Sequence, residues 1–313
     1  MATKKSAATV KKRTTAKKPA TRAAKTTTKV TTVRSAAAPV RATNVQRTER
    51  TDSILNLSLL NLVVAEVVGT FILTLVALAT AQMVVPLFVG LTLVVLVLVI
   101  GTASGSHVNP AVTFGLWAAR KVKSALVPFY WLAQMLGAFL AVVVLNGVAG
   151  KAPAFAFDHF GTFSWPIFWL ELVGTAVFLF GLTAVVKRQQ LSNTARALGI
   201  GLSLFVAIVV SGTLYNNIRT VAIKNYQDSM QHNPSKEPEI PHEIYVSGAT
   251  LNPAVALAAT ETTKAELQSS QTGGATEDKR YSRISWEVIL ATLVGAALGS
   301  NLALLVGHRF EED

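Results

Sequence analysis

Two copies of the tripeptide Asn-Pro-Ala, at Asn109-Pro110-Ala111 and Asn252-Pro253-Ala254, have the composition of a hydrogen-bonding site. Asn is a strong N-cap and Pro is favoured at the first position of a helix, so each copy predicts a helix start. If the Asn oxygen caps its own helix, the amide nitrogen is left free to donate a hydrogen bond to another molecule. Two such starts at one depth would disfavour cations and protons and tolerate a neutral hydrogen-bonding molecule.

The rest of the chain has the composition of a membrane protein, because 51% of its residues are hydrophobic and only 15% are charged. The apolar segments long enough to cross about 30 Å of hydrocarbon are 57–80, 84–103, 124–148, 165–186, 195–214 and 286–307. The segments Asn109–Ala119 and Asn252–Ala259 are too short to cross alone. We therefore predict an all-α membrane protein with six transmembrane helices and two re-entrant half-helices.

The tripeptides belong to a longer internal repeat. Matched pieces occur in the same order in both halves: EVVGT at 66–70 with ELVGT at 171–175, SGSHVNPAVT at 104–113 with SGATLNPAVA at 247–256, and Gly-Ala at 137–138 and 295–296. Each half contains three spans, and because three is odd the second half must enter the membrane from the opposite side. This inverted-topology repeat predicts that the half-helices dip in from opposite faces and meet near the centre.

These motifs resemble the aquaporin, or major intrinsic protein, family over about residues 57–307. The motifs that carry the resemblance are AEVVGTFIL, SGSHVNPAVTFG, AQMLGA and SGATLNPAV. The resemblance implies an aquaporin-like channel domain over 53–310, with repeat one at about 57–148 and repeat two at about 165–307. It also implies a homotetramer that passes water or small uncharged solutes. We expect neither an enzyme nor a cofactor, since no catalytic or metal-ligand constellation is evident.

The predicted selectivity filter departs from the family pattern. Alignment from the motifs puts its four positions at Val89, Ile208, Ala249 and Val255, where most family members have Arg in place of Val255. Four aliphatic side chains offer no hydrogen-bond donor, so discrimination among polar solutes should be weak and desolvation costly for water. The permeant stays open among water, ammonia, urea, hydrogen peroxide, small polyols and gases.

Three ionisable side chains near the motifs have two interpretations each. Glu66 and Glu171 could form a proton relay, which would make the chain a proton-coupled transporter, or could accept hydrogen bonds from re-entrant backbone. We favour the structural role, because it suits a symmetric pair of acids. His107 either lines the pore or satisfies its own loop. A non-conducting membrane scaffold is a further alternative for the whole protein.

Basic residues are concentrated at the N-terminus. Residues 1–50 hold 14 Lys and Arg and one acid, which leaves 15 basic and 16 acidic residues for 51–313. We predict that 1–52 form a disordered tail that contacts anionic lipid or, as an alternative, nucleic acid. Short basic loops at 119–123 and 187–196 fall on the same side, which predicts a cytoplasmic N-terminus in the cell membrane, with an organellar membrane as the alternative.

The second half carries an extra polar segment at 216–246, which this topology makes extracellular. It could form a lid over the pore, mediate assembly, or be a solvated insertion. Arg219 within it is a further hypothesis, as a replacement for the missing filter charge. Residues 311–313 form the C-terminal end of the chain.

Overall fold

The computed structural model describes residues 45–152, 155–232, 238–263 and 281–307. The chain divides into two units, Met1–Gln46 and Arg47–Asp313, and every contact described below belongs to the second. Most of the predicted basic tail and the C-terminal residues 311–313 lie outside the described ranges.

Within these ranges the structure is helical, and six of its helices are long and apolar enough to cross a membrane. They are α1 (Val45–Ala79), α2 (Val85–Ser104), α4 (Val127–Val148), α5 (Trp165–Lys187), α6 (Asn193–His232) and α10 (Trp286–Gly307). The two half-helices are α3 (Pro110–Ala118) and α8 (Pro253–Ala258), and α7 (His242–Tyr245) is a single turn. The predicted fold class is therefore confirmed.

The spans expose many large apolar side chains on their outer faces. Between 28% and 44% of each span is buried inside the chain, while Leu132, Val99 and Leu305 are each 69–71% exposed. Such faces suit lipid, whose tails are as apolar as Leu. Phe163, Trp165, Phe168 and Trp169 form a run of ring contacts at the start of α5, as expected where a span leaves the hydrocarbon.

The repeated Gly-Ala pairs lie where two helices cross closely. A Cβ atom at Gly137 of α4 would lie 2.4 Å from the Val67 carbonyl oxygen of α1. One at Gly295 of α10 would lie 2.4 Å from the Leu172 carbonyl oxygen of α5. Only a residue without a side chain fits these crossings, which explains why this part of the repeat is kept in both halves.

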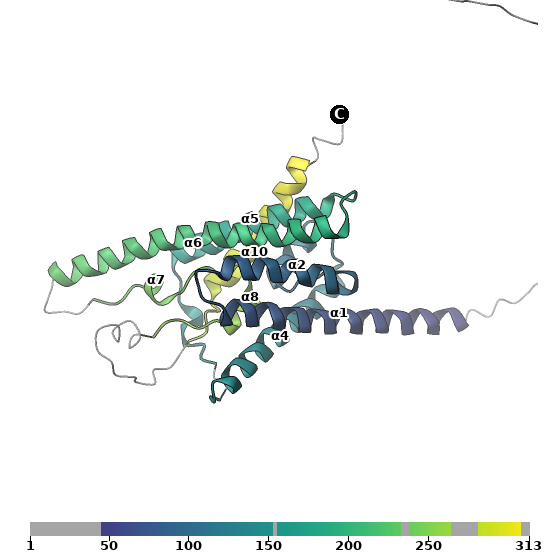
Figure 1. Cartoon of the computed structure of the whole chain (residues 1–313), viewed down its shortest axis with the longest axis horizontal. Coiled ribbons are helices and arrows are strands. Elements are labelled where there is room, and N and C mark those ends of the chain that lie inside the picture. The colour runs from purple at the N-terminus through teal and green to yellow at the C-terminus, as the bar shows by residue number, and fades with distance from the viewer. Residues whose placement is uncertain (1–44, 153–154, 233–237, 264–280, 308–313) are drawn as a thin grey trace, which may run out of the picture. The chain divides into compact units, whose positions relative to one another are not determined.

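The fifth span extends further than predicted. The apolar segment ends near residue 214, but α6 continues to His232, and Figure 1 shows it (green) running on past its neighbours on the side of α7. Residues 216–232 contain neither Gly nor Pro, so nothing stops the helix before Pro234. The first part of the predicted insertion is therefore helical. We call the end of the helices that carries residues 80–84, 155–164, 238–246 and 259–263 the insertion end.

Candidate functional site

Both Asn-Pro-Ala tripeptides start a half-helix. α3 begins at Pro110 and α8 at Pro253, and the preceding Asn is the N-cap in each case. Asn109 Oδ1 accepts a hydrogen bond from the Ala111 amide at 2.8 Å. Asn252 Oδ1 accepts one from the Ala254 amide at 3.0 Å. This is the local geometry that the residue types favour.

The two half-helices meet start to start through these same Asn side chains. Asn109 Nδ2 donates a hydrogen bond to the Leu251 carbonyl oxygen at 2.9 Å, and Asn252 Nδ2 donates one to the Val108 carbonyl oxygen at 3.0 Å. The amide nitrogens are thus less free than the sequence suggests, because one hydrogen of each links the loops. An amide carries two hydrogens, so each Asn retains a second donor.

The residue before each Asn has a left-handed backbone. φ is 46° at Val108 and 53° at Leu251, a region that costs a non-glycine residue of order 1–3 kcal/mol. At both positions this conformation turns the carbonyl toward the opposite loop, where it accepts the Asn bond. The strain is therefore part of how the two loops join.

Glu66 and Glu171 hold this strained backbone. Glu66 accepts hydrogen bonds from the backbone N–H groups of His107 at 2.9 Å and Val108 at 2.7 Å. Glu171 accepts them from the equivalent N–H groups of Thr250 and Leu251, both at 2.8 Å. Both acids are fully buried. In each repeat, then, one carboxylate satisfies two loop amides that have no helical partner.

The remaining contacts of the two acids differ. Gln134 Nε2 donates to Glu66 at 2.8 Å. Glu171 accepts a third hydrogen bond from Thr250 Oγ1 at 3.0 Å, and the guanidinium of Arg283 lies at ion-pair distance, 3.7 Å from Glu171 and 3.6 Å from Glu287. Arg283 is 1% exposed. Sequence analysis gave Arg283 no role, although an arginine that directly precedes an apolar span was a signal that it could be buried. Arg219, the residue hypothesised to replace the filter charge, is not among the described residues that line the cavity.

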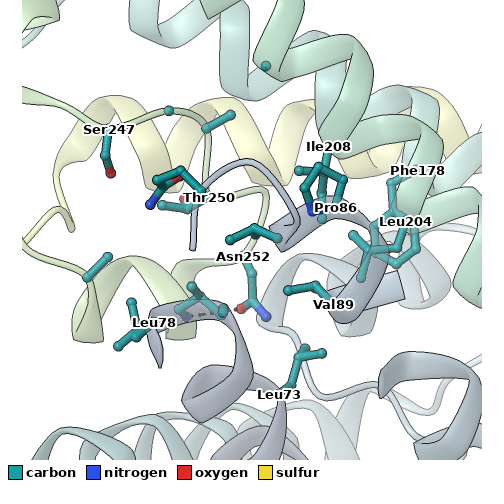
Figure 2. A pocket seen from close by; sticks show the side chains of 18 of the residues that line it. Leu73, Leu78, Pro86, Val89, Phe178, Leu204, Ile208, Ser247, Thr250 and Asn252 are labelled. Carbon is teal, nitrogen blue, oxygen red and sulfur yellow. Dashed lines mark hydrogen bonds between the residues drawn. The ribbon is translucent and has the colours of Figure 1, made fainter. Parts of the chain in front are cut away.

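A cavity of about 370 Å³ runs from the insertion end to the two tripeptides. Its lining includes Gln82 and Met83 at one end and Asn109 and Asn252 at the other. The four predicted filter residues all line this cavity: Val89, Ile208, Ala249 and Val255. Figure 2 shows the Asn252 amide between Leu78 on one side and Val89, Leu204 and Phe178 on the other. The walls of the cavity around Asn252 are therefore aliphatic and aromatic.

His107 lies at the wall of the cavity and is anchored to its own loop at the same time. Its Nδ1 is 3.1 Å from Thr113 Oγ1, and its ring stacks on Tyr130 with the centroids 4.2 Å apart. Tyr130 in turn donates a hydrogen bond to the Ser104 carbonyl. The side chain is 6% exposed, so it is held by these contacts and reaches the cavity with little freedom.

Comparison with known proteins relates the sequence to one family. The family model described as Major intrinsic protein matches residues 53–222. Aquaporin Z from Photorhabdus laumondii is 33% identical over 162 residues, which are 46% of this chain and 70% of that protein. Aquaporin Z from Rhodopseudomonas palustris is 33% identical over 188 residues (51% and 78%), and Aquaporin NIP2-2 from Zea mays is 30% identical over 175 residues (51% and 60%). The X-ray structure of the aquaglyceroporin from Plasmodium falciparum gives a TM-score of 0.48 at 20% identity, covering 78% of this chain and 95% of that one.

Proposed function

Because the chain belongs to the major intrinsic protein family and its relatives named above are aquaporins, we propose that it is a passive channel that excludes cations and protons. As a member of that family it is a channel for water or small solutes rather than an enzyme. The finer proposal concerns how the pore selects: it passes small uncharged molecules through the cavity between the insertion end and the paired tripeptides. The proposal also assigns the three tripeptide residues of each copy to this central site.

The observation that carries the proposal is the meeting of two helix starts at the cavity. Asn109 and Asn252 line it, and each has one amide hydrogen left after the bond to the opposite loop. A water molecule or small solute can accept from these donors. A cation finds two positive dipole ends and no acceptor there, because each Asn oxygen is used by its own cap.

The permeant is set by the ring of Val89, Ile208, Ala249 and Val255, which we propose is the filter. None of these side chains donates or accepts a hydrogen bond, so a molecule must shed part of its hydration to pass. Small solutes that lose little on desolvation are favoured over large polyols. This ring would act by size and apolar contact rather than by charge.

Glu66 and Glu171 act structurally in this proposal. Each carboxylate has both oxygens committed to loop N–H groups, and both side chains are 0% exposed. A proton relay needs a carboxylate that exchanges protons with the pathway, and neither residue lines the cavity. These contacts support a channel over a proton-coupled transporter.

The orientation and assembly follow from the family and the charge distribution. We propose a homotetramer in the cell membrane with the insertion end outside and the basic tail in the cytoplasm. In that orientation the tail can contact anionic lipid of the inner leaflet. Ser247 and Gly248, which line the cavity, then lie on the outer side of the tripeptides.

Stopped-flow light scattering on proteoliposomes tests the proposal. The water permeability is measured after an osmotic step, and the permeabilities to glycerol, urea and ammonia are then measured in the same way. We expect Val255→Arg to slow the permeant solute on the order of tenfold, because a guanidinium narrows an aliphatic ring and adds donors to it. Val255→Ile is the matched control for size without charge. Flow that the Arg leaves unchanged would remove Val255 from the filter.

The same assay separates the other candidate functions. Assembled protein without flow of any tested solute would contradict the channel and favour a membrane scaffold. Solute flow that requires a proton gradient, and that Glu66→Gln or Glu171→Gln uncouples while the protein stays folded, would instead favour a proton-coupled transporter.

A further inference from the structure

Three side chains from separate segments of the insertion end converge on one point. The Glu261 carboxylate lies between two imidazoles, with Oε2 2.7 Å from Nδ1 of His159 and Oε1 2.8 Å from Nε2 of His242. One ligand atom of each residue lies within 4.8 Å of the others. We propose that His159, His242 and Glu261 bind one divalent transition-metal ion of the Zn²⁺ class, which clasps these segments together.

The donor set favours zinc over hard cations. Two imidazoles and one carboxylate form a three-residue Zn²⁺ site that leaves a fourth position for water, whereas Mg²⁺ and Ca²⁺ prefer oxygen ligands. Ligand atoms around tetrahedral Zn²⁺ lie roughly 3.3 Å apart, so small side-chain rotations bring the present atoms into range. The side chain of His159 is 32% exposed while that of Glu261 is 3% exposed. Water can therefore reach an ion that the carboxylate holds from the buried side.

The surroundings of His242 provide the second contact that a metal-binding histidine usually has. Within the described residues its Nδ1 is buried without a hydrogen-bond partner, and it lies 3.6 Å from Glu287 Oε1. With the ion on Nε2, the Nδ1–H faces Glu287, which is the carboxylate–histidine–metal arrangement of known sites.

The other two ligands are also held in position. The His159 ring stacks on Tyr281 with centroids 3.9 Å apart, which fixes its plane. Glu261 is 3% exposed, and each of its two carboxylate oxygens faces one of the imidazoles.

The clasp would join parts of the chain that already touch through the backbone. The Glu261 amide donates to the Tyr281 carbonyl at 2.9 Å, and the Thr262 amide donates to the Tyr245 carbonyl at 2.7 Å. Glu261 follows the end of α8 at Ala258, and Ala259 between them lines the cavity. An ion here would hold the far end of the second half-helix at the mouth of the proposed pore.

Isothermal titration calorimetry of the tag-free full chain in detergent with ZnCl₂ tests the site. The chain has five His and no Cys, so few other zinc ligands compete. We expect one Zn²⁺ per chain, and at least tenfold weaker binding in His159→Ala, His242→Ala and Glu261→Gln. His232→Ala is the matched control, because His232 is an exposed histidine on α6 that bonds only the Asp228 carbonyl of its own helix, and it should leave binding unchanged. MgCl₂ should give no binding heat.

Two results would overturn the proposal: no zinc binding by the wild-type chain, or binding that none of the three substitutions weakens. Each variant must elute as the wild type does in size-exclusion chromatography, and Glu261→Gln keeps the side-chain shape, so loss of binding is not loss of fold. Calorimetry does not depend on transport. A chain that binds zinc but passes no solute would contradict the channel and leave the metal site standing.

Discussion

Both repeats use a buried Glu to bind two backbone N–H groups of a strained loop, but the other contacts of that Glu differ between the repeats. In the first, Glu66 accepts a further hydrogen bond from the neutral amide of Gln134; in the second, Glu171 accepts one from the Thr250 hydroxyl and lies 3.7 Å from the charged Arg283. Alignment on Gly137 and Gly295 puts Thr292 at the position of Gln134. Thr292 donates instead to the Val288 carbonyl of its own helix at 2.7 Å. Its side chain is too short to serve Glu171, and Arg283 enters from the loop before α10 in its place.

This difference indicates which parts of the repeat are constrained. The Glu and its two loop amides are the same in both halves, because both strained loops must present a carbonyl to the opposite Asn. The other contacts of the Glu are not constrained in this way. As a result the described contacts of Glu66 in the first repeat are with neutral groups, while the second repeat carries a buried ionic network at the insertion end that includes Arg283, Glu171, Glu287 and His242.

The sharpest test of this contrast replaces each acid by its amide. Glu171→Gln leaves the Arg283 charge buried with Glu287 as its one ionic partner among the described residues, so we expect a loss of about 3–5 kcal/mol in the free energy of unfolding. Glu66→Gln leaves no buried charge behind, and we expect about 1.5–3 kcal/mol for its weakened hydrogen bonds. Equilibrium unfolding in mixed SDS micelles measures both. Equal losses would mean that Arg283 does not distinguish the repeats.

The glycine crossings should instead respond alike in both halves. Gly137→Leu and Gly295→Leu force a side chain against a backbone oxygen, and we expect each to cost about 3 kcal/mol, the upper part of the range for overpacking. Gly147→Leu on the same helix α4 is the control, since nothing lies within 4 Å of a Cβ there. The yield of folded protein after detergent extraction reports the effect. A strong effect at only one of the two crossings would contradict the symmetric packing.

A second substitution should rescue the damaged second repeat. Arg283→Met in the Glu171→Gln background removes the uncompensated charge, and we expect it to restore about 1–3 kcal/mol as a coupling energy between the two sites. The same Arg283→Met change in a Glu66→Gln background should restore nothing, because Arg283 does not contact Glu66. Thermal unfolding followed by tryptophan fluorescence compares the four proteins. If the stability changes are additive in both backgrounds, Glu171 and Arg283 are not energetically coupled.

The smallest expected difference lies between the two aligned helix positions. Gln134→Leu removes the amide donor to Glu66 and should cost about 1.5 kcal/mol, as expected for a hydrogen bond to a charged group. Thr292→Val removes only a bond within its own helix and should change stability by less than about 0.5 kcal/mol. The unfolding titration used for the acids resolves both values. A costly Thr292→Val would imply a partner for this hydroxyl other than its own helix.

The sequence predicted the features with a local or repeated cause. The six spans and the two short helices follow from apolar length and from Asn-Pro starts, and the structure confirms them. The end of α6 was missed, because charge ended the apolar segment while no Gly or Pro ended the helix before residue 233. The filter assignment stays a prediction, although Val89, Ile208, Ala249 and Val255 all reach the cavity.

Contacts between distant segments could not be predicted from the sequence. Nothing near Arg283 in the chain identifies Glu171 as its partner, since 112 positions separate the two residues. The internal repeat gives no hint either, because Glu66 is paired with Gln134 and not with an arginine. His159, His242 and Glu261 likewise come from distant segments, so their spacing in the sequence does not match that of a metal-binding motif. Local propensity and internal symmetry act along the chain and can be read from it. The meeting of ionic groups depends on how the loops at the insertion end pack, which the tertiary structure alone decides.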